Sequence, residues 1–183
     1  CSLIRVPIAD QYKLILSDMF NEYELGSYEK AYDEENVSVR RFGSPVHSNI
    51  LQQNELANEA DIRINADNIF IAISDTYPIK DVMLPDQCNE HNTIIVQRTA
   101  NEEDNKRYES KALTDKVLNV IRHIDREVVV NVLPTTNVSN TYSIVNEVFK
   151  TGGQDNIKHL YVYPQPHKTD YDWNFSDKGI RIF

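Results

Sequence analysis

Apolar residues recur at intervals of three and four positions in three segments of the chain, which is the pattern of helices that bury one face. The first segment runs from Asp10 to about Gly26, and the second begins within the charged stretch 101–111. The third is expected to be capped by Ser139 and to end at the glycines 152–153. The inward positions are Tyr12, Ile15, Leu16, Met19, Phe20 and Tyr23, then Leu113, Val117, Val120, Ile121 and Ile124, and then Tyr142, Val145, Val148 and Phe149.

Short apolar or alternating runs between these segments predict β-strands. Two of the runs flank the polar turn 65–68, so we expect them to form a β-hairpin. A further segment, 179–183, is expected to add an edge strand. The six main runs are residues 37–42, 62–64, 69–73, 93–98, 128–133 and 157–163.

Strands and helices alternate from residue 93 to residue 163, which predicts a β-α-β-α-β unit with helices packed on a sheet. The expected fold class is therefore α+β, with a mixed sheet and this unit in the C-terminal half. A polar stretch near residues 97–105 indicates a boundary between a helix-plus-strand region, 1–98, and an α/β unit with an aromatic tail, 99–183. One continuous domain is the alternative.

Composition narrows the class of partners. The chain has 183 residues, 40% of them hydrophobic and 26% charged, which is the balance of a folded protein. A net charge of −9 argues against nucleic acid as a partner, because phosphate binding depends on clustered Lys and Arg. The sequence has no run of roughly 20 apolar residues, the length that a membrane-spanning helix needs.

The sequence contains no motif typical of catalysis or of metal binding. None of the five histidines is spaced as a metal ligand pair with another His or with Cys. The segment from Cys88 to His91 brings three candidate ligands together, but it is better interpreted as a polar loop. Nearby carboxylates are expected to raise the pKa of the Cys88 thiol and to reduce its reactivity. We therefore predict a protein that is not an enzyme and has no cofactor, metal or catalytic residues.

The first residue indicates a lipid anchor. A chain that begins with Cys1 rather than Met has been cut, and bacterial lipoproteins mature to an acylated N-terminal Cys. Cys1-Ser2-Leu3 resembles such a terminus, and in that family a Ser after the Cys implies the outer membrane. The alternative is a sequence that happens to begin at a Cys. We expect an outer-membrane location facing the periplasm, with the lipid as the only membrane contact.

The C-terminal half resembles two envelope families. The order of a helix, strand 127–133, helix 141–153 and strand 157–163 is similar to the periplasmic domain of ExbD and TolR proteins. Those proteins also carry an N-terminal membrane helix, which this chain lacks. The same order resembles CpaD-type lipoproteins of Flp/Tad pilus systems, which agree better with Cys1. Both resemblances cover about 50 to 100 residues and rest on pattern rather than on invariant motifs.

These resemblances imply a structural or accessory subunit of a secretion or pilus assembly machine, with other subunits of an envelope complex as partners. A periplasmic binding module for peptidoglycan or a small ligand is the alternative, and a hydrolase with scattered carboxylates is a third hypothesis. The aromatic tail is the expected interaction surface, through Tyr171, Trp173 and Phe175. The competing interpretation is that these aromatic side chains fold back and complete the core.

Overall fold

The computed structural model describes residues 28–31, 37–43, 66–98, 107–124, 127–152, 156–164 and 174–183, with the backbone alone for 28–31, 107 and 151–152. The helix expected after Asp10 and the strand expected at 62–64 lie outside these ranges.

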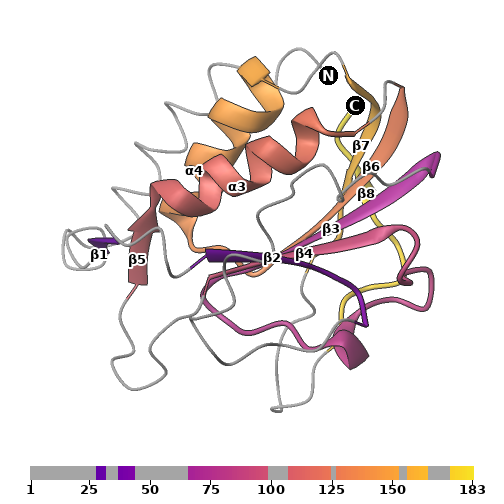
Figure 1. Ribbon diagram of the computed structural model, residues 1–183, viewed down its shortest axis with the longest axis horizontal. Helices are drawn as coiled ribbons and strands as arrows, with labels where there is room; N and C mark the ends of the chain where they lie inside the picture. Colours follow the sequence, from indigo (N-terminus) through magenta and orange to yellow (C-terminus); the bar gives the residue numbers. More distant parts are fainter. Residues whose placement is uncertain are drawn as a thin grey trace.

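The described core is a six-stranded mixed sheet in the order β2-β4-β3-β6-β7-β8 (Figure 1). The four inner strands run parallel, and the edge strands β2 and β8 are antiparallel to their neighbours. The expected α+β class with a mixed sheet is therefore confirmed. The strands are β2 (Val37–Arg41), β3 (Asn68–Ser74), β4 (Thr93–Arg98), β6 (Val128–Pro134), β7 (Ile157–Val162) and β8 (Ile180–Arg181).

Strand β3 lies at the centre of the sheet. Its apolar run Ile69–Ile73 is at most 1% exposed, which is the pattern of a parallel strand covered on both faces. Its two edges pair in parallel with β4 and with β6. The predicted hairpin of 62–64 with 69–73 is therefore wrong, because these neighbours already occupy the edges of β3. The β3–β6 pairing also joins the two halves on either side of residue 98 in one sheet.

Helix α3 (Lys111–Arg122) covers one face of the sheet and starts later than the charge pattern predicted. Residues 107–110 form strand β5, which pairs in parallel with β1 (Tyr28–Ala31). Ser110 then caps the helix, because its hydroxyl oxygen accepts the Leu113 N–H. The expected inward face is confirmed, since Leu113, Val117, Val120, Ile121 and Ile124 are all buried.

The second helix on this face consists of α4 (Val138–Ile144) and a π-helical continuation, η6 (Val145–Gly152). Its N-cap is Asn137, whose side chain accepts the Asn140 N–H, so the expected cap at Ser139 is wrong. The helix turns Asn140, Ile144, Val148 and Phe149 inward.

Two of the inward positions expected for this helix are wrong. Tyr142 is 38% exposed and Val145 is 48% exposed. The hydrogen bonds of Asn140, described below, fix the rotation of the helix so that these two positions lie off its inward face.

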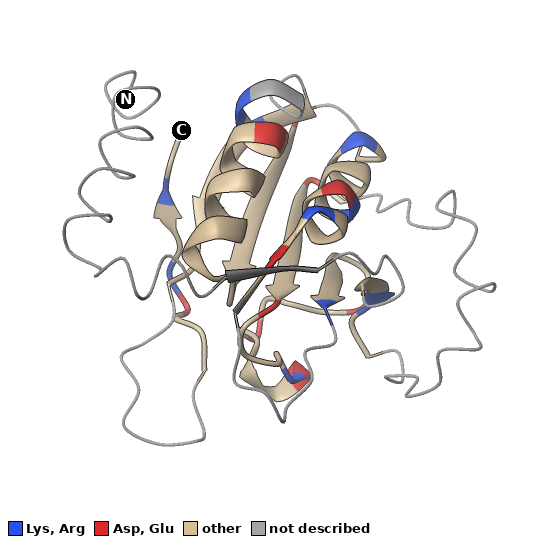
Figure 2. Ribbon diagram, turned by 90° about the vertical axis from the view of Figure 1, so that its left-hand side faces the viewer, with Lys and Arg blue, Asp and Glu red and all other residues tan. Residues whose placement is uncertain are grey.

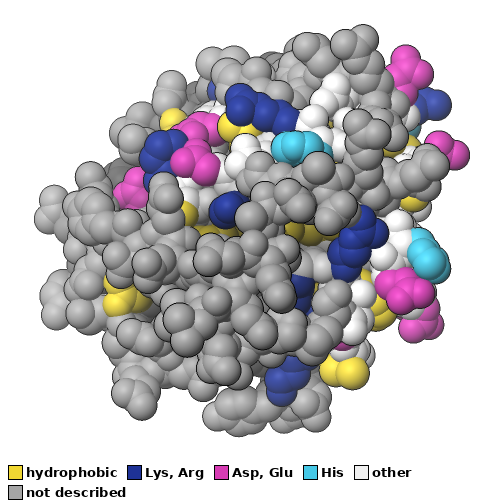
Figure 3. All heavy atoms as spheres, viewed as in Figure 1, with side chains coloured by type: hydrophobic (Ala, Val, Ile, Leu, Met, Phe, Trp, Pro, Cys, Tyr) yellow, Lys and Arg dark blue, Asp and Glu magenta, His cyan; other side chains and the backbone are white. Residues whose placement is uncertain are grey.

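Irregular segments and the short 3₁₀ helix η5 (Asp81–Met83) cover the opposite face of the sheet. The core therefore has two layers, one under the helices and one under these segments. Charged residues lie on the helices and toward strand ends in Figure 2, while the middles of the strands carry almost none. On the face seen in Figure 3, described side chains of both charges are interspersed. We call the layer under the irregular segments the lower core layer, and it consists of Phe70, Ala72, Ile79, Met83, Leu84, Cys88, Ile95, Leu133, Tyr163 and Phe175.

Candidate functional site

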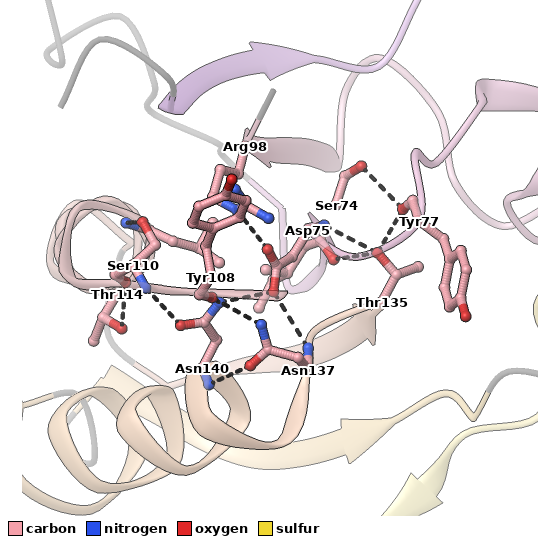
Figure 4. A network of polar contacts seen from close by, with 12 residues as sticks. Ser74, Asp75, Tyr77, Arg98, Tyr108, Ser110, Thr114, Thr135, Asn137 and Asn140 are labelled. Carbon is pink, nitrogen blue, oxygen red and sulfur yellow. Dashed lines mark hydrogen bonds and ion pairs between the residues drawn. The ribbon is translucent and has the colours of Figure 1, made fainter. Parts of the chain in front are cut away.

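Buried polar side chains gather where the parallel strands β3, β4 and β6 end (Figure 4). Because the carboxyl ends of parallel strands share one edge of the sheet, residues distant in sequence meet there. We call this group the carboxyl-edge cluster. It comprises Ser74, Asp75, Arg98, Tyr108, Ser110, Thr135, Asn137 and Asn140.

The centre of the cluster is an ion pair between Asp75 and Arg98. Arg98 Nε donates to Asp75 Oδ1 at 2.6 Å, and the two side chains are 5% and 0% exposed respectively. The guanidinium carbon of Arg98 lies 5.1 Å from the ring centroid of Tyr108, close enough for a cation–π contact. Removal of two charges from water is costly, so the remaining polar atoms of such a pair need partners.

The second oxygen of Asp75 is held by the start of α4. The Asn137 backbone N–H donates to Oδ2 at 3.2 Å, and Asn140 Nδ2 donates to the same oxygen at 2.8 Å. Three donors therefore surround the carboxylate, all from segments far from Asp75 in sequence. This arrangement explains why the fully buried side chain at position 140 is an amide rather than an apolar group.

The two asparagines also attach strand β5 to helix α4. Both side-chain amides donate to the Tyr108 carbonyl oxygen at 2.9 Å. Asn140 Oδ1 accepts the Ser110 N–H at 2.8 Å, immediately before helix α3 begins. The cluster thus fixes the entry to α3 and the start of α4 with the same side chains.

Thr135 connects the segments that follow β3 and β6. Its hydroxyl accepts the Asp75 N–H at 3.0 Å and donates to the Tyr77 carbonyl oxygen at 2.7 Å. The Thr76 N–H donates to the Thr135 carbonyl oxygen at 3.0 Å. Thr76 Oγ1 is buried and has no hydrogen-bond partner in the described part of the chain.

A second Asp–Arg pair lies apart from this cluster, on the β2 edge strand and η5. Arg40 Nη2 donates to Asp81 Oδ1 at 2.7 Å, and the Gly43 N–H donates to Oδ2 at 3.0 Å. Burial raises the pKa of Asp81, but the hydrogen bond from Arg40, the Gly43 N–H and the Arg40 charge together outweigh burial and leave the pKa below its ordinary value. Gly43 has φ +78°, a conformation that favours glycine at this turn.

Cys88 is buried in the lower core layer at 5% exposure. Burial raises its pKa to about 11, while a hydrogen bond with Thr93 acts in the opposite direction. The expected direction of the shift is thus found, but its cause is loss of water rather than nearby carboxylates. Glu90 and His91 lie close to each other on the surface, with His91 Nε2 3.4 Å from Glu90 Oε1. Within the described ranges, no group of three or more metal-binding side chains is present.

The predicted interaction residues have different outcomes. Cys1, Tyr171 and Trp173 lie outside the described residues, so the lipid anchor and the aromatic surface stay predictions there. Phe175 is 3% exposed, packs in the lower core layer, and donates its backbone N–H to the Met83 carbonyl oxygen at 2.9 Å. The prediction that Phe175 belongs to an exposed interaction surface is therefore wrong. Its side chain completes the core, as the competing interpretation held.

Sequence reasoning missed the carboxyl-edge cluster. The available signal was the type of residue that follows each apolar run, namely Asp75 after β3, Arg98 at the end of β4, and 135–137 after β6. Polar residues at these positions meet only if the strands are parallel neighbours, and the predicted hairpin concealed that arrangement.

Comparison with known proteins identifies a family. No curated protein is significantly similar to this chain in sequence. No helix in the described portion is long and apolar enough to cross a membrane. Residues 1–174 match the SUa-2TM family model, the SMODS- and Ubiquitin system-associated 2TM effector domain. The match covers nearly the whole chain, so the protein belongs to the SUa-2TM effector domain family.

Proposed function

We propose that this chain is an effector domain that acts by binding rather than by catalysis, and that a small ligand contacts the carboxyl edge of the parallel strands of its sheet. The proposal develops the small-ligand alternative. An envelope subunit with a lipid anchor on Cys1 stays a separate prediction.

The observation that carries the proposal is a reversal of the strand order between β3 and β6. Strand β3 is followed in the chain by β4 on one side of the sheet, whereas β6 is followed by β7 on the other side. The segment after β3 runs to η5 on one face of the sheet, whereas the segment after β6 enters α4 on the other face. In open α/β sheets, ligands bind outside the carboxyl ends of the strands at the point where two such segments diverge. This step is an analogy between folds, and the polar residues of the cluster give it chemical content.

The state of the candidate chemical groups supports binding over catalysis. The raised pKa of Cys88 keeps its sulfur a thiol at neutral pH, and the thiol is not the nucleophilic form. The Asp75 carboxylate accepts hydrogen bonds from Arg98, Asn137 and Asn140, so its oxygens are already committed. The family description, an effector domain, agrees with a module that responds to or delivers a signal.

A fragment screen by NMR tests the proposal. We expect small polar fragments to perturb amide resonances of residues 75–77 and 135–137 more than those of any other segment. Thr136→Trp, in the segment after β6, should abolish these perturbations. Asp67→Trp, at the opposite end of β3, should leave them intact and serves as the matched control.

Two outcomes would contradict the proposal. Fragments that gather on the exposed side of α4 or along β8 would place the binding surface elsewhere. Equal effects of the two Trp variants would show that the carboxyl edge has no special role.

A further inference from the structure

We propose that the ligand of this edge carries an oxyanion, a carboxylate or a phosphate, and that the two Nη atoms of Arg98 bind it. The inference rests on the proposed function and names the chemical class of its ligand.

Arg98 has more hydrogen-bond donors than its described neighbours use. A guanidinium carries five N–H groups in a planar fork and has no acceptor. Arg98 donates through Nε to Asp75, and within the described residues its Nη atoms have no hydrogen-bond partner. The side chain is nevertheless only 5% exposed. Neither Nη atom is among the fully buried polar atoms that lack a partner in the described part of the chain, so the outer part of the fork reaches solvent and is open to an acceptor supplied by a ligand.

The other contacts of Arg98 leave the outer part of the fork pre-oriented. The Nε bond to Asp75 and the contact with the Tyr108 ring fix the plane of the guanidinium from two directions. Asp75 does not depend on Arg98 alone, because Asn137 and Asn140 hold its second oxygen. An arginine held this way loses little conformational entropy when it binds a ligand.

The geometry of the fork favours an oxyanion over a neutral acceptor. Parallel N–H groups match two oxygens of one carboxylate or phosphate, and charge-assisted bonds of this kind are about twice as strong as neutral ones. The Asp75 carboxylate opposes part of the attraction between Arg98 and an anion, so the preference for an oxyanion rests on the match between the two Nη groups and a pair of ligand oxygens.

Matched pairs of small molecules distinguish the sources of the oxyanion. We would titrate the full chain with inorganic phosphate, with AMP against adenosine, and with glutamate against glutamine, at constant ionic strength. The readout is the side-chain Nε–H resonance of Arg98, with that of the exposed Arg122 as the internal control. We expect at least one anion to shift Arg98 while its neutral counterpart and the Arg122 resonance show no change.

A conservative substitution tests the fork itself. Arg98→Lys retains a positive charge beside Asp75 but loses the paired N–H groups, so affinity for the active anion should fall at least ten-fold. Arg122→Lys should leave the affinity unchanged. If Arg98→Lys does not fold, the resonance titration of the unaltered chain still decides the question.

The results separate this inference from the proposed function. Neutral fragments that perturb residues 75–77 and 135–137, with no anion affecting Arg98, would overturn the oxyanion and leave the binding edge intact. Equal affinity of the two Lys variants would likewise overturn the role of the fork. If no fragment or anion perturbs this edge, both proposals fail together.

Discussion

Two Asp–Arg pairs in the described part of the protein have similar bond lengths but very different surroundings. Asp75 and Arg98 join the central strands at 2.6 Å with both side chains almost completely buried. Arg40 and Asp81 join the β2 edge strand to η5 at 2.7 Å, and 31% of the Asp81 side chain is exposed. The same chemistry therefore acts once inside the sheet and once near its surface.

The difference shows how burial changes what a charged pair requires. Around Asp75, amide donors from α4 complete the coordination, because an unpaired atom there has no water to replace its partner. Around Asp81, one backbone N–H is sufficient, since water reaches the rest of the carboxylate. The inner pair thereby determines the position of a helix, whereas the outer pair attaches a turn.

Loss of the inner carboxylate should have the largest effect on stability. Asp75→Ala leaves Arg98 as a buried charge without its partner, which we expect to reduce the free energy of unfolding by about 3–5 kcal/mol. Urea denaturation followed by circular dichroism measures the change. Asp86→Ala, at an exposed position, is the control and should change stability by less than about 0.5 kcal/mol. A loss below about 1 kcal/mol for Asp75→Ala would show that the pair is not held as described.

Removal of the amide at position 140 should have the next largest effect. Asn140→Ala deprives Asp75, Tyr108 and Ser110 of one partner each, so a loss of about 1–3 kcal/mol is expected. A double-mutant cycle with Asp75→Ala should reveal strong coupling, because the two side chains share a bond.

Ser139, which was predicted to cap helix α4, provides the control variant for this measurement. Ser139→Ala should be nearly neutral, because Asn137 rather than Ser139 caps the helix. If Ser139→Ala were as costly as Asn140→Ala, the start of α4 would be misplaced.

The outer pair should contribute less and should depend on pH. Asp81→Asn is expected to cost about 1 kcal/mol or less at neutral pH, as partly exposed pairs do. The folded-state pKa of Asp81 lies below its ordinary value of 3.8, so its stabilisation is present above that value and is lost as pH falls through the lower folded pKa. Thermal unfolding of both proteins from neutral pH to about pH 2 should show the difference disappearing at the acidic end. A difference that persists or grows in acid would contradict this account.

The smallest effect on stability is expected for an ion pair that lies on the protein surface. Lys111 Nζ lies 2.8 Å from Asp115 Oδ1 on the exposed side of α3. The hydrogen bond and charge of Asp115 raise the pKa of Lys111 above its ordinary value, burial acts weakly in the opposite direction, and Glu147 adds to the rise. Lys111→Gln should change the free energy of unfolding by no more than about 0.5 kcal/mol, and by less in high salt. A loss comparable to that of Asp75→Ala would remove burial as the explanation of the series.

Local sequence patterns predicted those strands, and the one helix, whose buried face is set by the spacing of their own apolar residues. The apolar runs at 69–73, 93–98 and 128–133 and the inward face of α3 follow directly from residue spacing, and the structure has them in place. The charged segment before α3 was the exception. It was expected to begin the helix, but pairing with β1 makes residues 107–110 a strand.

The sequence by itself determined that this chain builds a mixed α+β core, because burial of an apolar stripe depends only on spacing within each element. The tertiary structure alone decided the strand order, with β3 between β4 and β6, because pairing partners are chosen by contacts between distant segments. That order brings Asp75 and Arg98 together from the ends of two strands, and Asn140 to the same carboxylate. Asn140 in turn fixes which face of α4 is inward, so Tyr142 and Val145 lie outside despite their apolar spacing. A pattern along one helix cannot contain that information, since the bond that sets its rotation joins Asn140 to Asp75, 65 residues away in the sequence.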